Sequence, residues 1–124
     1  MKAIICKNNL SFIGLNNGLP WKSKKDLKHF KKLTEGSNLL VGYNTYSTLP
    51  PLSGREVYID DDIIPVDVMD WCIGGKKTYE KYCHLFTELH ISHVDDDTIG
   101  DTLFPDLRNL NPECRIFNYY FETD

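Results

Sequence analysis

Short apolar runs recur along this chain of 124 residues and are separated by polar or amphipathic stretches. The apolar runs predict β-strands at "KAIICK", "NLLVG", "REVYI", "VMDWCIGG", "ELHISHV" and "CRIFNYYFE". Helical periodicity predicts one helix from near Ser23 to near Gly36 and a second in "KKTYEKYCHLF", with a short helical turn in "YNTYSTL". The Asn- and Gly-rich "NNLSFIGLNNGLP" predicts a long loop. Strands that alternate with helices indicate an α/β fold with a largely parallel sheet.

The first predicted helix raises a question about one acid. The segment "GLPWKSKKDLKHFKKLT" holds six lysines and a single carboxylate, Asp26. At about 100° per residue Asp26 lies on the apolar face of the helix, and the lysines spread over the opposite half. An acid on such a face is rarely left without a partner. Ser23 and Asp26 have capping-box spacing, so the acid either caps the helix or faces a ligand, and a residue at this position can do both.

Two predicted strands end in glycine just before a predicted helix. "LLVG" precedes "YNT", and "WCIGG" precedes "KKTY". Helix N-termini present unpaired N–H groups that suit phosphates, and glycine lets a ligand approach the backbone closely. Either junction by itself is typical of a tight turn, because neither is a G-x-G-x-x-G motif or a P-loop. Two such ends in one small sheet favour a dinucleotide lying across them.

Charge is distributed unevenly along the chain. Residues 1–59 carry nine Lys and Arg against three Asp and Glu (+6), and residues 60–124 carry five against fifteen (−10), which sum to the net charge of −4. A solvated lysine face explains the basic half, and an anionic small molecule or a nucleic acid is the alternative. The cysteines and histidines lack metal-ligand spacing, so no metal is expected. No run is long enough for a signal peptide or a membrane span, so the cytoplasm is the expected compartment.

Taken together, these motifs resemble those of the dihydrofolate reductase family. The matching runs, in the family's order, are "IGLNNGLPW", "DLKHFKKLT", "LLVGYNTY", "PLSGRE", "CIGGKKTYEKY", "LHISHVD" and "GDTLFPD". The resemblance implies a single domain over residues 1–124, with a mostly parallel central sheet and helices on both faces. It also implies reduction of 7,8-dihydrofolate to tetrahydrofolate by a hydride from NADPH, with NADH as the alternative cofactor.

The resemblance also assigns roles to individual residues. The catalytic group would be Asp26, which faces the pterin, with Trp21 and Leu19 at the inner edge of a lid formed by residues 8–23. Folate would contact Ile4, Ile5, Asp26, Leu27, Phe30, Leu49, Leu52, Arg55, Ile73 and Ser92, with Arg55 pairing with the glutamate α-carboxylate. The dinucleotide would contact Cys6, Ile13, Gly14, Asn17, Leu19, Gly42, Tyr43, Asn44, Thr45, Gly74, Gly75, Lys76, Lys77, Thr78 and Tyr79. Asp101 would contact the lid, and the peptide between Gly74 and Gly75 would be cis.

The chain departs from the family pattern in its adenosine half. Tyr43 stands where the family usually has a basic residue, and Asp60, Asp61 and Asp62 stand where hydroxyl or basic groups usually meet the 2′-phosphate. The segment of about residues 60–70 is shorter than the family's, and so is the C-terminal tail, whose closing hairpin is expected to be incomplete. These departures predict a weaker preference for NADPH over NADH.

Two other functions compete with the reductase. The first is a non-catalytic relative that binds a pterin or serves a structural role, favoured by the reduced adenosine segment and opposed by the intact lid, Asp26 and paired glycines. The second is a nucleic-acid binder that uses the lysine face, opposed by the negative net charge and by the lack of interleaved exposed aromatic residues. We therefore expect dihydrofolate and a nicotinamide dinucleotide as ligands, no nucleic-acid or membrane partner, and a monomer.

Overall fold

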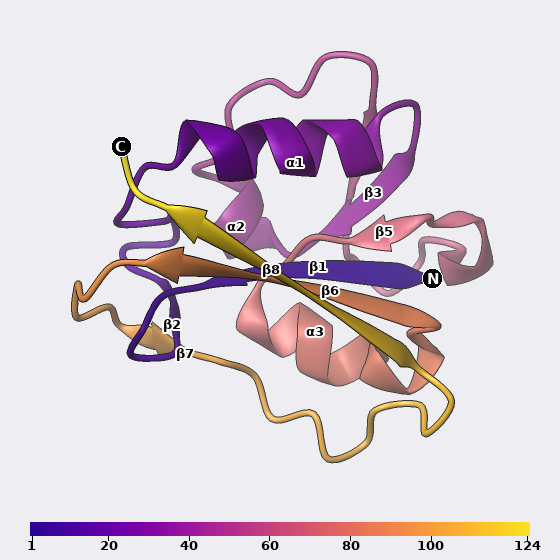
Figure 1. Ribbon diagram of the computed structural model, residues 1–124. Coiled ribbons are helices and arrows are strands. Elements are labelled where there is room, and N and C mark those ends of the chain that lie inside the picture. The colour runs from indigo at the N-terminus through magenta and orange to yellow at the C-terminus, as the bar shows by residue number, and fades with distance from the viewer.

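The computed structural model describes residues 1–124 and arranges them around a six-stranded sheet (Figure 1). The strand order is β4-β3-β5-β1-β6-β8, and every neighbouring pair is parallel. A separate antiparallel pair joins β2 to β7. The strands are β1 (Lys2–Lys7), β2 (Phe12–Gly14), β3 (Asn38–Val41), β4 (Glu56–Ile59), β5 (Trp71–Cys72), β6 (Glu88–Asp95), β7 (Thr102–Leu103) and β8 (Arg115–Glu122).

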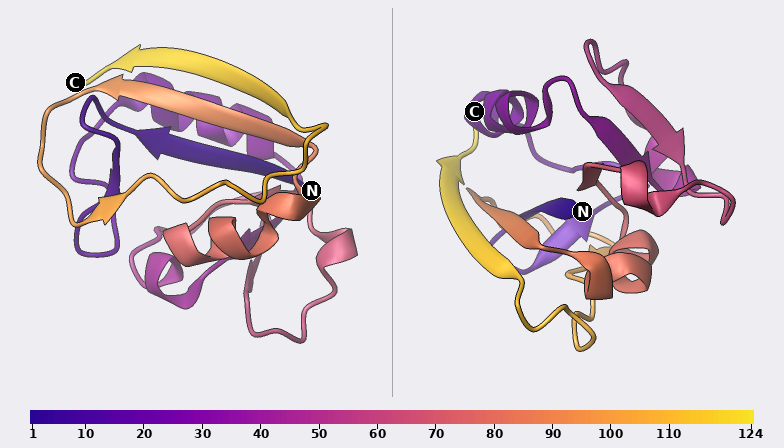
Figure 2. Two further views of the ribbon diagram at one scale, coloured as in Figure 1. Left: turned by 90° about the horizontal axis from the view of Figure 1, so that it is seen from below. Right: turned by 90° about the vertical axis from the view of Figure 1, so that its right-hand side faces the viewer.

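Helices cover both faces of the sheet, as the views in Figure 2 show. They are α1 (Lys24–Thr34), α2 (Tyr43–Tyr46) and α3 (Lys76–Tyr82), with 3-10 turns at Val66–Val68 and Cys83–Leu85. Side chains alternate across each strand, so neighbouring residues enter different cores. On the α3 face, Ala3 and Ile5 pack with Tyr79 and Phe86. On the α1 face, Ile4 belongs to a second cluster, against which Phe30 of α1 packs. The predicted α/β architecture is therefore confirmed.

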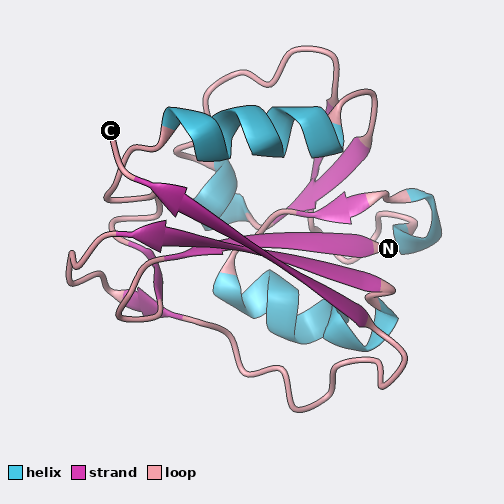
Figure 3. Cartoon of the chain, in the orientation of Figure 1, coloured by secondary structure: helices cyan, strands magenta, loops and turns pink.

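Three sequence-based predictions of local structure need correction, as the strand and loop assignment in Figure 3 makes visible. The predicted loop at residues 8–20 contains β2, whose partner β7 lies in "GDTLFPD", which also gave no strand signal. Both strands are too short for periodicity to be detected. The run "VMDWCIGG" is a strand only over Trp71–Cys72, because a 3-10 turn occupies the residues after Pro65. The second predicted helix ends at Tyr82, and a 3-10 turn follows it.

The last strand occupies one edge of the sheet. β8 pairs with β6 residue by residue, from Glu88 opposite Arg115 to Asp95 opposite Glu122. This pairing is parallel, so β6 and β8 form no closing hairpin. None of the helices combines the length and the apolar character that a membrane crossing requires.

Candidate active site

A cavity of about 870 Å³ opens where the strands of the sheet end, and 31 residues line it. β1 contributes Ile4 to its wall, and Gly42 and Gly74 mark the points where the chain leaves β3 and β5. Because the carboxyl ends of parallel strands meet at one edge of a sheet, turns that are distant in the sequence converge there. The cavity therefore has the position at which α/β folds usually bind ligands.

Most of the residues that the sequence assigned to ligand binding lie around this one cavity. They are Ile4, Ile5, Cys6, Ile13, Gly14, Asn17, Leu19, Asp26, Leu27, Phe30, Gly42, Tyr43, Asn44, Thr45, Leu49, Leu52, Ile73, Gly74, Gly75, Lys76, Lys77, Thr78, Tyr79 and Ser92. Asp26, Leu27 and Phe30 come from α1 and Ile4, Ile5 and Cys6 from β1, whereas Gly42, Gly75, Lys76 and Lys77 stand where α2 and α3 begin.

Two predicted site residues do not line the cavity. Trp21 is buried, with 7% of its surface exposed, and is not among the lining residues. Arg55 is held by its own neighbours: Nη1 donates to the Thr34 hydroxyl at 3.2 Å, and Nε donates to the Ser53 carbonyl at 3.1 Å. Its guanidinium also lies 5.7 Å from the centre of the Phe30 ring. These contacts hold Arg55 beside Phe30, which lines the cavity.

Asp26 takes part in the helix cap through its backbone N–H and not through its carboxylate. Its N–H donates to the Ser23 side chain at 3.3 Å, so Ser23 caps α1. Its carboxylate lines the cavity although the residue is only 6% exposed, and no lysine or arginine forms a salt bridge with it. A buried carboxylate without an ionic partner is costly unless another group hydrogen-bonds to it. The cap thus leaves the carboxylate free to bind a ligand.

Other polar groups near Asp26 also lack partners. The Trp21 Nε1 and Ser92 Oγ atoms are buried and make no hydrogen bond within the protein. Cys6 pairs with Ser92 across β1 and β6, and its side chain also lines the cavity. Burial is the main cause that raises the pKa of the Cys6 thiol well above its usual range, and the negative charge of Asp26 raises it further. The thiol therefore stays protonated beside Asp26, where it cannot act as a thiolate nucleophile.

The two glycine turns, at Gly42 and at Gly74–Gly75, are in direct contact where they line the cavity. Gly42 N–H donates to the Gly74 carbonyl at 2.7 Å. A Cβ atom on Gly42 would lie 2.6 Å from Thr78 Oγ1, and one on Gly75 would lie 2.7 Å from Thr45 Oγ1. Each glycine thus makes room for a threonine of the opposite turn. The peptide between Gly74 and Gly75 is cis, as predicted.

These turns fit a dinucleotide. No side chain caps the first N–H groups of α2 or α3, and Lys76 and Lys77 line the cavity beside them. Backbone N–H groups with nearby lysines suit phosphate oxygens. A further contact joins α3 to the sheet, because the Tyr79 hydroxyl donates to the Ile4 carbonyl at 2.6 Å. This hydrogen bond ties α3, which follows the glycine turn, to β1.

Asp60 is a cavity residue that the sequence did not assign to ligand contact. It follows β4 and accepts hydrogen bonds from Lys81 Nζ at 3.0 Å and the Tyr82 hydroxyl at 2.8 Å, and Lys81 also pairs with Asp62. Burial alone would raise the pKa of Asp60, but the hydrogen bonds from Lys81 and Tyr82 outweigh it and hold the pKa below its usual value. Asp60 is thus ionised, and α3 supplies the cation that balances it.

The lid region is tied to the rest of the cavity by polar contacts. The Asn16 N–H donates to the Asp101 carboxylate at 3.0 Å, so the predicted contact of Asp101 with the lid is confirmed. The Thr48 hydroxyl donates to the Asn17 carbonyl. The cavity is also lined by residues to which the sequence assigns no ligand contact, namely Gly18, Thr48, Pro50, Thr102 and Leu103. Thr102 and Leu103 form β7, and the pairing of β7 with β2 helps to bring them to the cavity.

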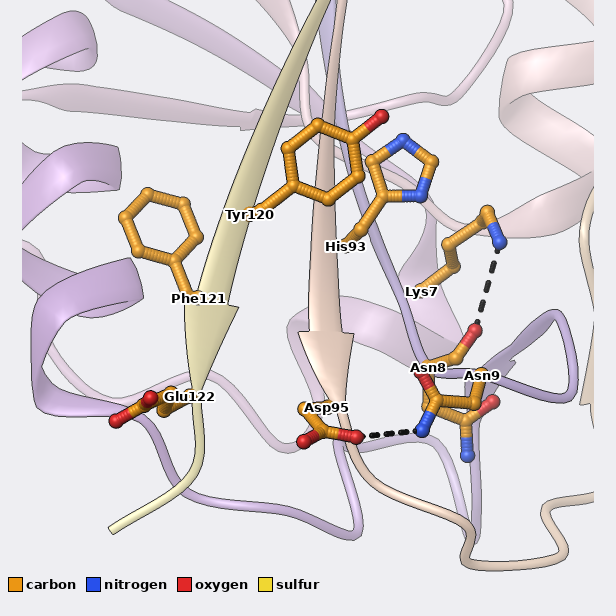
Figure 4. A pocket seen from close by; sticks show the side chains of 8 residues that line it. All are labelled: Lys7, Asn8, Asn9, His93, Asp95, Tyr120, Phe121 and Glu122. Carbon is orange, nitrogen blue, oxygen red and sulfur yellow. Dashed lines mark hydrogen bonds between the residues drawn. The ribbon is translucent and has the colours of Figure 1, made fainter.

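A second, smaller hollow of about 460 Å³ lies where β1, β6 and β8 end (Figure 4). The ring of His93 stacks on that of Tyr120 with centroids 4.7 Å apart. Asn9 donates to Asp95 at 2.8 Å, and Lys7 donates to the Asn8 carbonyl at 3.5 Å. Most of its polar groups are thus paired with one another, unlike Asp26 in the main cavity. Nowhere in the structure do three or more metal-ligating side chains converge.

The fold and the cavity define a small α/β protein that binds its ligands at the carboxyl edge of a parallel sheet. The dihydrofolate reductase family model matches residues 1–59. A dihydrofolate reductase from Buchnera aphidicola subsp. Schizaphis graminum is 35% identical over 136 aligned positions, which cover 92% of this chain and 81% of the relative. The chain therefore belongs to the dihydrofolate reductase family.

Further comparisons agree with this assignment. A dihydrofolate reductase from Buchnera aphidicola subsp. Acyrthosiphon pisum is 28% identical, and the match covers 97% of this chain and 94% of the relative. The structure of dihydrofolate reductase from Enterococcus faecalis, complexed with NADP(H) and RAB-propyl, superposes with a TM-score of 0.75 at 23% identity. That match covers 86% of this chain and 77% of the other, and it shows the same fold.

Proposed function

We propose that this protein reduces 7,8-dihydrofolate to tetrahydrofolate, with NADPH as the reductant. The observation that carries the proposal is the buried carboxylate of Asp26, which lines the cavity without an ionic partner. The ring of a dihydropterin supplies an amino group and an adjacent N–H, which are the donors that a carboxylate can accept. Family membership supports the same activity, since the relatives are named dihydrofolate reductases.

The residues of the chain have distinct tasks in this reaction. Asp26 orients the pterin and holds negative charge near it, which favours the protonated form of N5, while water carries the proton. Ile4, Leu27, Phe30 and Ile73 supply apolar walls that exclude bulk water and strengthen this field. The dinucleotide, when bound along the glycine turns, supplies the hydride for the pterin C6.

The remaining assignments are part of the same proposal. Arg55, which Thr34 and Ser53 hold in place, would pair with the α-carboxylate of the glutamate tail. The Gly42 and Gly74–Gly75 turns would hold the pyrophosphate, with Lys76 and Lys77 as cations. We also propose a monomer. The four free cysteines support a reducing compartment, for which we propose the cytoplasm. The segment of about residues 60–70 and the tail are proposed to be shortened relative to the family.

A spectrophotometric assay tests the proposed activity. We expect the nicotinamide absorbance band of NADPH to decay only when dihydrofolate and the protein are both present, with tetrahydrofolate as the product. If the folded protein binds folate but leaves the absorbance unchanged with either NADPH or NADH, the chain is instead a non-catalytic pterin-binding relative.

We predict that the preference for NADPH over NADH is much weaker than is usual in the family. NADPH carries an additional 2′-phosphate, and here Tyr43 and the aspartates that follow β4 stand where basic or hydroxyl groups usually contact it. Loss of one charge-assisted contact costs about 1.5–3 kcal/mol, or roughly ten- to a hundredfold in affinity. Lys81 neutralises part of the acidic cluster, so repulsion of the phosphate is moderated but not removed.

Michaelis constants for NADPH and NADH at one ionic strength measure this preference. A ratio of about a hundredfold or more in favour of NADPH, near 2.7 kcal/mol, would show that another basic group replaces the missing one. Lys76 and Lys77 are the first groups to test in that case, since both line the cavity.

A further inference from the structure

The two halves of α1 are held in place by different means. In the second half, Phe30 and Leu33 pack on the buried cluster that includes Ile4, so apolar contacts fix the helix against the sheet. The first half carries Asp26, and its one apolar side chain, Leu27, is 57% exposed at the cavity. The position of Asp26 must therefore depend on contacts other than the hydrophobic core.

Residues 119–124 supply those contacts. The Lys24 N–H donates to both carboxylate oxygens of Asp124, at 3.1 and 3.2 Å. The Asp124 N–H donates in return to the Lys22 carbonyl at 2.9 Å, so Asp124 holds the chain on both sides of Ser23. Figure 1 shows the end of β8 beside the beginning of α1.

Aromatic packing continues the same contact along α1. The centroid of the His29 ring lies 4.1 Å from that of the Tyr119 ring and 5.3 Å from that of the Phe121 ring. Figure 4 shows Phe121 leaving β8 on the side opposite Tyr120, because side chains alternate along a strand. Burial lowers the pKa of His29, so its ring is neutral near pH 7 when it packs on Tyr119. β8 thus forms the support for the first half of α1.

We infer that Asp124 is a positioning residue for Asp26. The first N–H groups of a helix have no partners within the helix, and here Ser23 accepts from Asp26 while Asp124 accepts from Lys24. Asp26 lies two residues beyond Lys24, so a shift of the first turn would move its carboxylate relative to the cavity. The inference rests on the proposed function, because the position of Asp26 matters there for binding the pterin.

Steady-state kinetics of Asp124→Ala and Asp124→Asn test the inference. For Asp124→Ala we expect the KM for dihydrofolate to rise about three- to tenfold, in line with the loss of a helix cap, and the KM for NADPH to stay unchanged. Asp124→Asn should restore the KM for dihydrofolate, because the amide oxygen still accepts the Lys24 N–H. Glu122→Ala is the matched control, since Glu122 lies on the neighbouring hollow and makes no hydrogen bond with α1.

A readout that does not depend on activity separates this inference from the proposed function. Amide exchange at Lys24 should quicken in Asp124→Ala and remain slow in Asp124→Asn and in Glu122→Ala. The inference is overturned if Asp124→Ala leaves the exchange at Lys24 or the KM for dihydrofolate unchanged. It is also overturned if Asp124→Ala raises the KM for both substrates equally, or if Asp124→Asn does not restore the KM for dihydrofolate. If the wild-type protein fails to reduce dihydrofolate, the proposed function is wrong, and exchange at Lys24 still decides whether Asp124 holds α1.

Discussion

Asp26→Asn is expected to lower the turnover of dihydrofolate by about ten- to a hundredfold at neutral pH, with the fold intact. Asparagine has nearly the size of aspartate but lacks the negative charge that pairs with the pterin. A hydrogen bond to a charged group contributes about 1.5–3 kcal/mol, and each 1.36 kcal/mol corresponds to roughly a tenfold change in rate. The loss should shrink at low pH, where substrate can arrive already protonated. Turnover measured over a pH series checks the loss of activity, and the melting temperature of the same sample checks that the fold is intact.

Ser23→Ala is the matched control for this variant. The Ser23 side chain accepts the Asp26 N–H at 3.3 Å but does not line the cavity. Loss of a serine cap costs about 1 kcal/mol of stability, so Ser23→Ala should melt earlier and keep most of its turnover number, while its KM for dihydrofolate rises as in Asp124→Ala. Near-normal activity of Asp26→Asn at neutral pH would contradict the assignment of Asp26 to the pterin. A large fall in its melting temperature would mean that Asp26 acts mainly in the cap.

Gly75→Ala is expected to weaken cofactor binding by more than about tenfold. The added Cβ would lie 2.7 Å from Thr45 Oγ1, closer than such atoms approach one another in proteins. Overpacking of this kind costs about 1–3 kcal/mol, because neighbouring groups must move. Here the group that must move is the side chain of Thr45 in α2, which lines the proposed dinucleotide site. Titration of the protein with NADPH, followed by tryptophan fluorescence, measures the affinity.

Two further variants test whether the close contact with Thr45 causes the expected effects of Gly75→Ala. Gly54→Ala places a side chain at a positive φ of 72° with no heavy atom within 4 Å, so it should lose stability and bind NADPH normally. Adding Thr45→Ala to Gly75→Ala removes the crowded hydroxyl and should recover part of the lost stability. An affinity for NADPH that is unchanged in Gly75→Ala would show that the dinucleotide does not lie across these turns.

Local patterns in the sequence were enough to predict much of the candidate site. Asp26 stood out because an acid interrupts the apolar face of a helix whose period can be counted over eleven residues. The glycine turns were recognisable because each follows an apolar strand directly, and the fold then brings Gly42 to Gly74. In both cases the residues that define the pattern are neighbours in the chain. The parallel sheet then brings the separate motifs together at its carboxyl edge.

Features that depend on distant partners could not be predicted in this way. β2 and β7 are short strands about ninety residues apart, so neither has a period of its own. The acidic residues after β4 gave no sign that Lys81 of α3 would pair with Asp60 and Asp62. Asp124 and Lys24 are separated by 100 positions, and no local motif relates them. Arg55 was assigned to folate by resemblance alone, and the structure adds the contacts with Thr34 and Ser53.

The most direct test of the account follows the hydride itself. NADPH that carries deuterium at the transferred position of its nicotinamide is incubated with dihydrofolate and the protein, and the folate product is analysed by mass spectrometry and NMR. The account predicts tetrahydrofolate with one deuterium at C6, formed at a much lower rate by Asp26→Asn. Oxidation of the cofactor without label in the folate product, or a label that appears equally fast with Asp26→Asn at neutral pH, would contradict it.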